Sequence, residues 1–190
     1  MVKNLKNNKM KLFIKITGFI VVAFLIISCD TNPSLQKYYV NSKENNEFIS
    51  IDLPSSILEL KDNNISEDIK NTLSTIKKVN FLALQLSDTN KELYTSEKQK
   101  VKDILKNPKY KQLVRMKMGK TSILVNLLGE EDAIDEVIVF ASDNEKGFAI
   151  VRVLGENMNP SNILKLTQEI KMDGDSEQLK QLGGLLSSLK

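Results

Sequence analysis

The sequence predicts an α+β fold: a two-layer sandwich in which a mixed, mostly antiparallel sheet of about five to six strands carries helices on one face. Three patterns predict this fold. Strands and helices alternate in the first half of the domain, four consecutive strands with short links follow, and one helix comes last. The resulting order, β-α-β-α-β-β-β-β-α, favours an antiparallel meander, because short links join strands that are neighbours in the sheet.

The first half contains two strands and two helices. "EFISIDLP" predicts a strand in which apolar and polar residues alternate until Pro54 ends it, and "PSSILEL" predicts a helical turn. Ser66 then caps a helix, and the apolar run "VNFLALQL" predicts a strand covered on both faces. A second helix fits residues 91–106, with Asn107-Pro108 as its stop. The apolar faces comprise Ile69, Leu73 and Ile76 in the first helix and Val101, Ile104 and Leu105 in the second.

The second half begins with four strand-like runs, "YKQLVRMKM", "TSILVNLL", "DEVIVFAS" and "GFAIVRVL". Between the first two, "MGKTS" is similar to the end of a phosphate-binding P-loop. However, Val114 stands where that motif needs a glycine, and strand alternation follows where the motif needs a helix. We therefore place Gly119-Lys120 in a two-residue hairpin turn, where glycine supplies the positive φ. Asn159-Pro160 opens the last helix, which we expect to run through Ile163, Leu166, Thr167 and Ile170.

The C-terminal segment, residues 173–190, predicts an amphipathic helix or a tail. Gly183-Gly184 weakens this helix by about 1 kcal/mol per glycine relative to alanine. A short isolated helix is marginal, so we expect docking on the domain or fraying rather than a partner site. Its heptad-like leucines are Leu179, Leu182, Leu186 and Leu189.

The N-terminal segment, residues 1–28, matches a secretory signal peptide. Five lysines and no acid precede the uncharged run "ITGFIVVAFLIISC", which is the charged and apolar order of such a signal. A membrane-spanning helix needs about 17–25 residues. This run has 14 and is followed at once by Asp30, so a cleaved signal is favoured over an anchor. Translation could start at Met1 or at Met10, which begins a compact signal of its own.

Cys29 is the only cysteine, and we predict that it is the site of lipidation. "IISC" resembles the lipobox of bacterial lipoproteins, which implies cleavage before Cys29, acylation by chains such as palmitate, and a membrane partner held through that lipid. Two or three chains on one residue make the attachment effectively permanent. The alternative is a cysteine buried at the end of an apolar helix. The predicted organisation continues with a lipidated cysteine and polar tether at 29–47, which includes one short helix around Leu35, Tyr38 and Tyr39, and with the α+β domain at 48–172.

Composition excludes several functions. Without the leader lysines the chain has 22 Lys and Arg against 24 Asp and Glu, a net charge of −2. We therefore expect no nucleic-acid binding, which needs a clustered basic face. The chain has no histidine, which removes histidine-based acid–base catalysis and most transition-metal sites. We predict no catalytic residue, metal or cofactor. A carboxylate pair or a Ser-Lys pair stays open, because their members meet only in the fold.

Two acidic stretches are candidates for a metal site. "GEEDAIDE", residues 129–136, gathers five carboxylates, and we interpret it as a solvated loop between strands. "DGDSE", residues 173–177, begins like a calcium-binding loop. However, Gln178 stands where that loop needs glycine and Gly184 where it needs glutamate, so we interpret it as a turn.

With these segments in place, the chain resembles a family of small lipoproteins from Bacteroidetes catalogued as domain of unknown function 4252. The resemblance is carried by "CDTNPSLQKYYV", "EFISIDLPSSIL", "IKKVNFLALQL", "NPKYKQLVRMK", "DEVIVFASD" and "GFAIVRVLGE". It implies a lipid-anchored protein of the cell envelope, at the outer membrane, on either its periplasmic or its surface side. It implies no catalytic residues.

Two function classes are consistent with these observations. The first is a non-catalytic binding or envelope-sensing module with an unknown envelope protein as its possible partner, because an anchor and a single domain accompany missing catalytic residue types. The alternative is an envelope hydrolase that uses carboxylates or a Ser-Lys pair. A deep pocket with convergent acids would favour the hydrolase, and a smooth domain with one apolar patch would favour the binding module.

Overall fold

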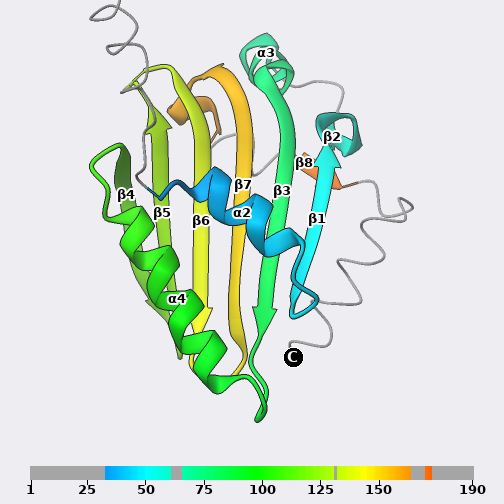
Figure 1. The fold of residues 1–190 in the computed structure, drawn as a ribbon. Coiled ribbons are helices and arrows are strands. Elements are labelled where there is room, and N and C mark those ends of the chain that lie inside the picture. The colour runs from blue at the N-terminus through cyan, green and yellow to red at the C-terminus, as the bar shows by residue number, and fades with distance from the viewer. Residues whose placement is uncertain (1–32, 61–65, 131, 164–169, 173–190) are drawn as a thin grey trace, which may run out of the picture. The chain divides into compact units, whose positions relative to one another are not determined.

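The computed structural model describes residues 33–60, 66–130, 132–163 and 170–172. The chain divides into two compact units, Met1–Pro33 and Ser34–Lys190, and the second contains all of the elements below. One six-stranded sheet with helices packed against it forms this unit (Figure 1). The predicted α+β sandwich is therefore confirmed.

The large sheet has the strand order β1-β3-β7-β6-β5-β4, and every neighbouring pair is antiparallel, so the sheet is not mixed. The last four strands form the predicted meander, because short turns join each to the next. β2 (Leu58–Leu60) follows a 3-10 turn, Ser55–Ile57, and pairs with β8 (Ile170–Met172) in a separate small sheet. The strands of the large sheet are β1 (Phe48–Pro54), β3 (Ile76–Gln85), β4 (Tyr110–Met118), β5 (Thr121–Gly129), β6 (Ile134–Asp143) and β7 (Gly147–Met158).

Two helices, α2 (Leu35–Lys43) and α4 (Lys91–Leu105), lie across one face of the sheet (Figure 1). They are amphipathic, and their apolar residues enter one core cluster with the inward side chains of the strands. Four aromatic rings meet edge to face or tilted at its centre, with Phe148 contacting the rings of Phe48, Tyr94 and Phe140.

Helix α2 is the short helix expected around Leu35, Tyr38 and Tyr39, but it packs on the sheet instead of lying in a tether. Ser34 caps it by accepting a hydrogen bond from the Lys37 N–H, and Leu35 and Tyr39 are buried on the sheet. The segment is mostly polar, so its fold depends on these few apolar contacts. Residues 34–47 therefore belong to the folded domain rather than to the tether drawn over 29–47.

The opposite face of the sheet has its own apolar cluster. α3 (Glu67–Thr75) contributes Ile69 to it, beside Leu53 of β1 and Phe81 of β3. The helix ends one residue earlier than its apolar spacing predicts, since Ile76 has extended backbone and begins β3. Residues 79–84 of β3 are all buried, which confirms a strand covered on both faces.

The predicted hairpin turn at Gly119-Lys120 is confirmed. It joins β4 to β5, and Gly119 has φ +60°, which glycine adopts without strain. No helix follows, so the P-loop interpretation fails on geometry as well as on sequence. The Lys120 ammonium instead pairs with Glu145 at 2.5 Å between the two facing turns.

One polar group lies deep in the core. Arg152 of β7 donates to both carboxylate oxygens of Glu136 of β6, at 2.5 Å and 3.0 Å, and to the Gln36 side chain of α2 at 2.8 Å. The interpretation of residues 129–136 as a solvated loop is therefore wrong at its end, where β6 has begun and Glu136 is buried. This pair fixes α2 over the middle of the sheet.

Several predictions fall outside the described residues. These are the signal peptide, Cys29, the acidic stretch 173–177 and the C-terminal segment 173–190. The last helix is described from Pro160 to Ile163, where it starts as expected. The expectation that it includes Ile170 is wrong, because Ile170 begins β8 and pairs with Leu60.

Candidate functional site

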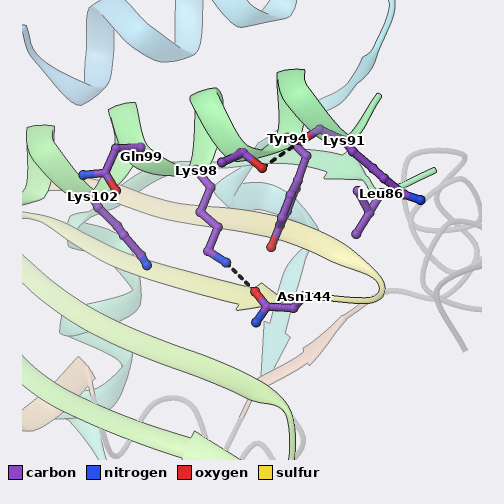
Figure 2. Close-up of a pocket in the computed structure, with 8 residues that line it drawn as sticks. Leu86, Lys91, Tyr94, Lys98, Gln99, Lys102 and Asn144 are labelled. Carbon is purple, nitrogen blue, oxygen red and sulfur yellow. Dashed lines mark hydrogen bonds between the residues drawn. The ribbon is translucent and has the colours of Figure 1, made fainter. Parts of the chain in front are cut away.

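Helix α4 places three lysines beside its buried face. Tyr94, Val101 and Leu105 pack into the core, and Lys98, Lys102 and Lys106 follow at intervals of four, along one side of the helix. Figure 2 shows Lys98 and Lys102 descending from α4 towards the strands. Two neighbouring pockets share Lys102. We call them the outer and inner pockets and the whole surface the α4 groove.

The outer pocket lies towards the start of α4 and has a volume of about 510 Å³. It is held in shape by Tyr94, whose hydroxyl donates to the Asp143 carbonyl at 2.7 Å. Lys98 donates to the Asn144 side chain at 2.6 Å, as Figure 2 shows, and its ammonium lies 5.0 Å from the Tyr94 ring centre. The pocket is lined by Leu86, Lys91, Tyr94, Thr95, Lys98, Gln99, Lys102 and Asn144.

The inner pocket lies between α4 and strands β4 to β6 and has a volume of about 360 Å³. Its floor is apolar, its inner wall carries small polar groups, and three cations stand at its rim. The floor consists of Leu105, Tyr110, Leu124 and Phe140, the polar wall of Ser122, Asn126 and Ser142, and the rim of Lys102, Lys106, Arg115 and the exposed Gln112.

Two of the three rim cations have no acidic partner among the described residues. Lys106 pairs with Asp103 at 2.7 Å, but no described residue forms an ion pair with Lys102 or Arg115. Arg115 donates to the neutral Gln112 side chain instead. Partial burial lowers the pKa of Lys102, and the charges of Lys98, Arg115 and Lys106 lower it further. A helix gains no stability from like charges four residues apart, so this arrangement is suited to receiving an anion.

Asn126 is the second polar feature of the inner pocket. Its side chain is only 2% exposed and lines the pocket from β5. The side-chain amide donates to the Tyr110 carbonyl at 3.4 Å, whereas the side-chain oxygen, Oδ1, accepts no hydrogen bond from any described residue. A buried acceptor without a donor is costly, because its desolvation is not repaid. A hydroxyl entering the pocket would satisfy it.

Three kinds of reactive site bear on the described residues of the groove: a carboxylate pair, a Ser-Lys pair and a metal site. Neither pocket has a carboxylate among the described residues that line it, so neither holds a carboxylate pair. Ser122 and Ser142 share the inner pocket with Lys102, but no hydrogen bond joins a lysine ammonium to either hydroxyl among the described residues. In the described ranges, no three His, Cys, Asp or Glu side chains gather as a metal ion requires.

The groove was not predicted from the sequence. Lysines on a helix are typical of a solvated face, and their partners come from strands far along the chain. The spacing of Lys98, Lys102 and Lys106, with no acid one turn away from Lys102, was the available signal. No sequence signal pointed to Asn126, because an asparagine inside a strand is identified as a pocket residue only from its burial in the structure.

Comparison with known proteins gives one match. The model of a family described as a domain of unknown function (DUF4252) matches residues 38–166, more than half of the 190-residue chain. No curated protein and no solved structure matches. In the part of the chain that the structure describes, no helix combines the length and apolar character needed to cross a membrane.

Proposed function

Because the chain belongs to the DUF4252 family, a domain of unknown function, we propose a function from the geometry of the α4 groove. The protein is a non-catalytic binding module that takes a small anionic ligand in this groove. A lipid on Cys29 holds the module in the cell envelope, at the outer membrane. The protein is a lipoprotein from a member of the Bacteroidetes.

One observation carries the binding proposal: the groove gathers cations around a pocket that has no carboxylate among its described lining residues. Lys102 is partly buried near three other positive charges, and no carboxylate lies among the described residues that line the pocket. An anion in the pocket would relieve this repulsion. Hydrogen bonds between ions contribute more than neutral ones, about 1.5–3 kcal/mol each.

The binding proposal is tested by isothermal titration with pyrophosphate as the probe. The protein is the mature chain, residues 29–190, with Cys29→Ser to keep it soluble. We expect saturable binding that weakens about tenfold in Lys102→Gln, which removes one ion–ion hydrogen bond. Lys77→Gln is the matched control, because Lys77 is an exposed β3 lysine, paired with Glu156 at 3.6 Å, that lines no described pocket.

Absence of saturable binding to the wild-type protein would reject the anion-binding function. Equal pyrophosphate affinities of the wild type and Lys102→Gln would show that the anion binds outside the groove. Binding should also weaken with added salt, since screening reduces the attraction between the rim cations and the anion.

The anchor is supported by the sequence: the lysine-rich leader, the short apolar run and "IISC" coincide at Cys29. Labelled palmitate should enter the wild-type protein, and the mature chain should begin at Cys29. Cys29→Ser should abolish both acylation and processing while leaving the domain folded. Incorporation of palmitate into the Cys29→Ser protein would refute the lipidation site.

A hydrolase is the second candidate, favoured by one observation. Ser122 and Ser142 line the inner pocket beside Lys102, whose lowered pKa is what a lysine general base requires. A fluorophosphonate probe, which reacts with activated serines, distinguishes the two functions. Labelling of either serine that is lost in Lys102→Gln would establish the hydrolase in place of the binding module.

A further inference from the structure

The inner pocket selects among anions. It is deeper than its charged rim: Lys102 and Arg115 stand at the mouth, whereas Asn126 and Ser142 lie behind them at 2% and 5% exposure. A ligand that fills it must therefore carry its charge at one end and a different chemistry at the other. This inference rests on the proposed anion-binding function and names the class of the ligand.

The buried end of the pocket requires a hydrogen-bond donor. Asn126 Oδ1 accepts no hydrogen bond from a described residue, and the dianionic phosphate of a phosphate monoester cannot donate one, because all of its oxygens are acceptors. A hydroxyl group can donate to Asn126. It can also exchange hydrogen bonds with Ser142, whose hydroxyl serves as donor or acceptor.

The floor of the pocket suits a body with apolar faces. The ring of Phe140 and the side chain of Leu124, at 1% and 7% exposure, form it together with Tyr110. An acyl chain would match this floor but would leave the amide and hydroxyl groups of the wall without partners, which is costly. A sugar ring presents C–H groups on its faces and hydroxyls at its edge, and so matches both.

We propose that the inner pocket binds a phosphorylated monosaccharide, with the phosphate between Lys102 and Arg115 and a ring hydroxyl on Asn126. The volume of about 360 Å³ is within the range of small-molecule sites. Arg115 offers a planar fork of donors that suits a phosphate, and Lys102 adds a point charge. The same phosphorylated polyol chemistry occurs free in solution and on membrane headgroups.

The test compares three probes on the mature chain with Cys29→Ser: glucose 6-phosphate, inorganic phosphate and glucose. Isothermal titration should give glucose 6-phosphate an affinity about tenfold or more above that of phosphate, because the sugar adds apolar burial and a hydrogen bond. Glucose alone should bind more weakly than glucose 6-phosphate. Equal affinities for phosphate and glucose 6-phosphate would overturn the proposal while leaving anion binding intact, and no binding by any probe would overturn both.

Asn126→Ala locates the sugar. It should weaken glucose 6-phosphate about two- to tenfold by removing one hydrogen bond, while phosphate affinity stays unchanged and shows that the rim is still formed. Ser142→Ala is a second, smaller change in the same wall and should act in the same direction. Unchanged sugar-phosphate affinity in both variants would refute this placement of the ring.

A second arm identifies the source of the ligand. Vesicles of phosphatidylcholine with phosphatidylinositol present a phosphorylated polyol as a headgroup. Cosedimentation of the wild-type protein, but not of Asn126→Ala, with these vesicles supports the proposal and assigns the ligand to a membrane. Binding of glucose 6-phosphate without cosedimentation supports it and assigns the ligand to solution. Equal cosedimentation of both proteins would contradict a headgroup in this pocket.

Discussion

Replacing Glu136 by alanine should destabilise the domain more than removing any surface ion pair. The change leaves the Arg152 guanidinium, whose side chain is 2% exposed, in the core without its carboxylate. Two hydrogen bonds are lost, at 2.5 Å and 3.0 Å, and only the bond to Gln36 remains. Breaking a buried ion pair in this way costs about 3–5 kcal/mol, which is a large part of the 5–15 kcal/mol that stabilises a typical protein.

Thermal unfolding followed by circular dichroism measures this loss. For a domain of about 150–250 residues, 1 kcal/mol corresponds to roughly 2–4 °C, so Glu136→Ala should lower Tm by about 6–20 °C. Glu67→Ala is the control, because its carboxylate pairs with Lys70 on the surface at 78% exposure and should change Tm little.

A double replacement tests whether the loss of stability comes from leaving the buried Arg152 without a partner. Glu136→Leu with Arg152→Met removes both charges and keeps side-chain volume, and should be much closer to the wild type than Glu136→Ala. A Glu136→Ala protein that melts within a degree or two of the wild type would refute the buried pair as described. So would a double variant as unstable as the single one.

Three further changes test the turn between β6 and β7. Gly147→Ala should destabilise the fold strongly, because φ is +126° and the new Cβ would lie 2.2 Å from the Leu84 carbonyl oxygen; urea unfolding measures the loss. Tyr94→Phe should cost about 1 kcal/mol in the same assay, since it removes the 2.7 Å hydrogen bond to the Asp143 carbonyl. The backbone N–H of Glu145 holds the pKa of Asp143 below its usual range, with help from a threonine hydroxyl. Its stabilisation is therefore complete above the unfolded pKa of about 3.9 and is lost as pH falls through the lower folded value. The stability difference between wild type and Asp143→Asn should be largest at neutral pH and shrink below about pH 4; a difference that stays constant down to pH 2 would contradict this.

The sheet could be predicted because its signal is local. Period-two alternation marks β4 to β7, and short turns such as Gly119-Lys120 leave few ways to connect them. α4 was predicted within one residue, since an apolar stripe and Asn107-Pro108 define its end. These elements depend on neighbours in the sequence, which a single sequence displays.

The remaining features depend on contacts between distant residues. α2 lies in a polar segment, and its helix is stabilised by burying Leu35 and Tyr39 on strands whose position the sequence does not specify. Glu136 and Arg152 meet because β6 and β7 pair with Ile138 opposite Arg152, and a change of register by one residue would separate them. The α4 groove also depends on contacts between distant residues. Lys102 belongs to α4, whereas Asn126 belongs to β5, and the whole of β4 separates them in the sequence.

The most direct test of the central claim, that the α4 groove binds a small anion, is a ¹H–¹⁵N NMR titration of the mature Cys29→Ser chain with pyrophosphate. The account predicts saturable shifts for Lys102, Arg115 and Asn126, while Ile51 and Phe81, in the cluster on the opposite face of the sheet, stay in place. Saturable shifts centred on the opposite face, or none at Lys102 and Arg115, would contradict it.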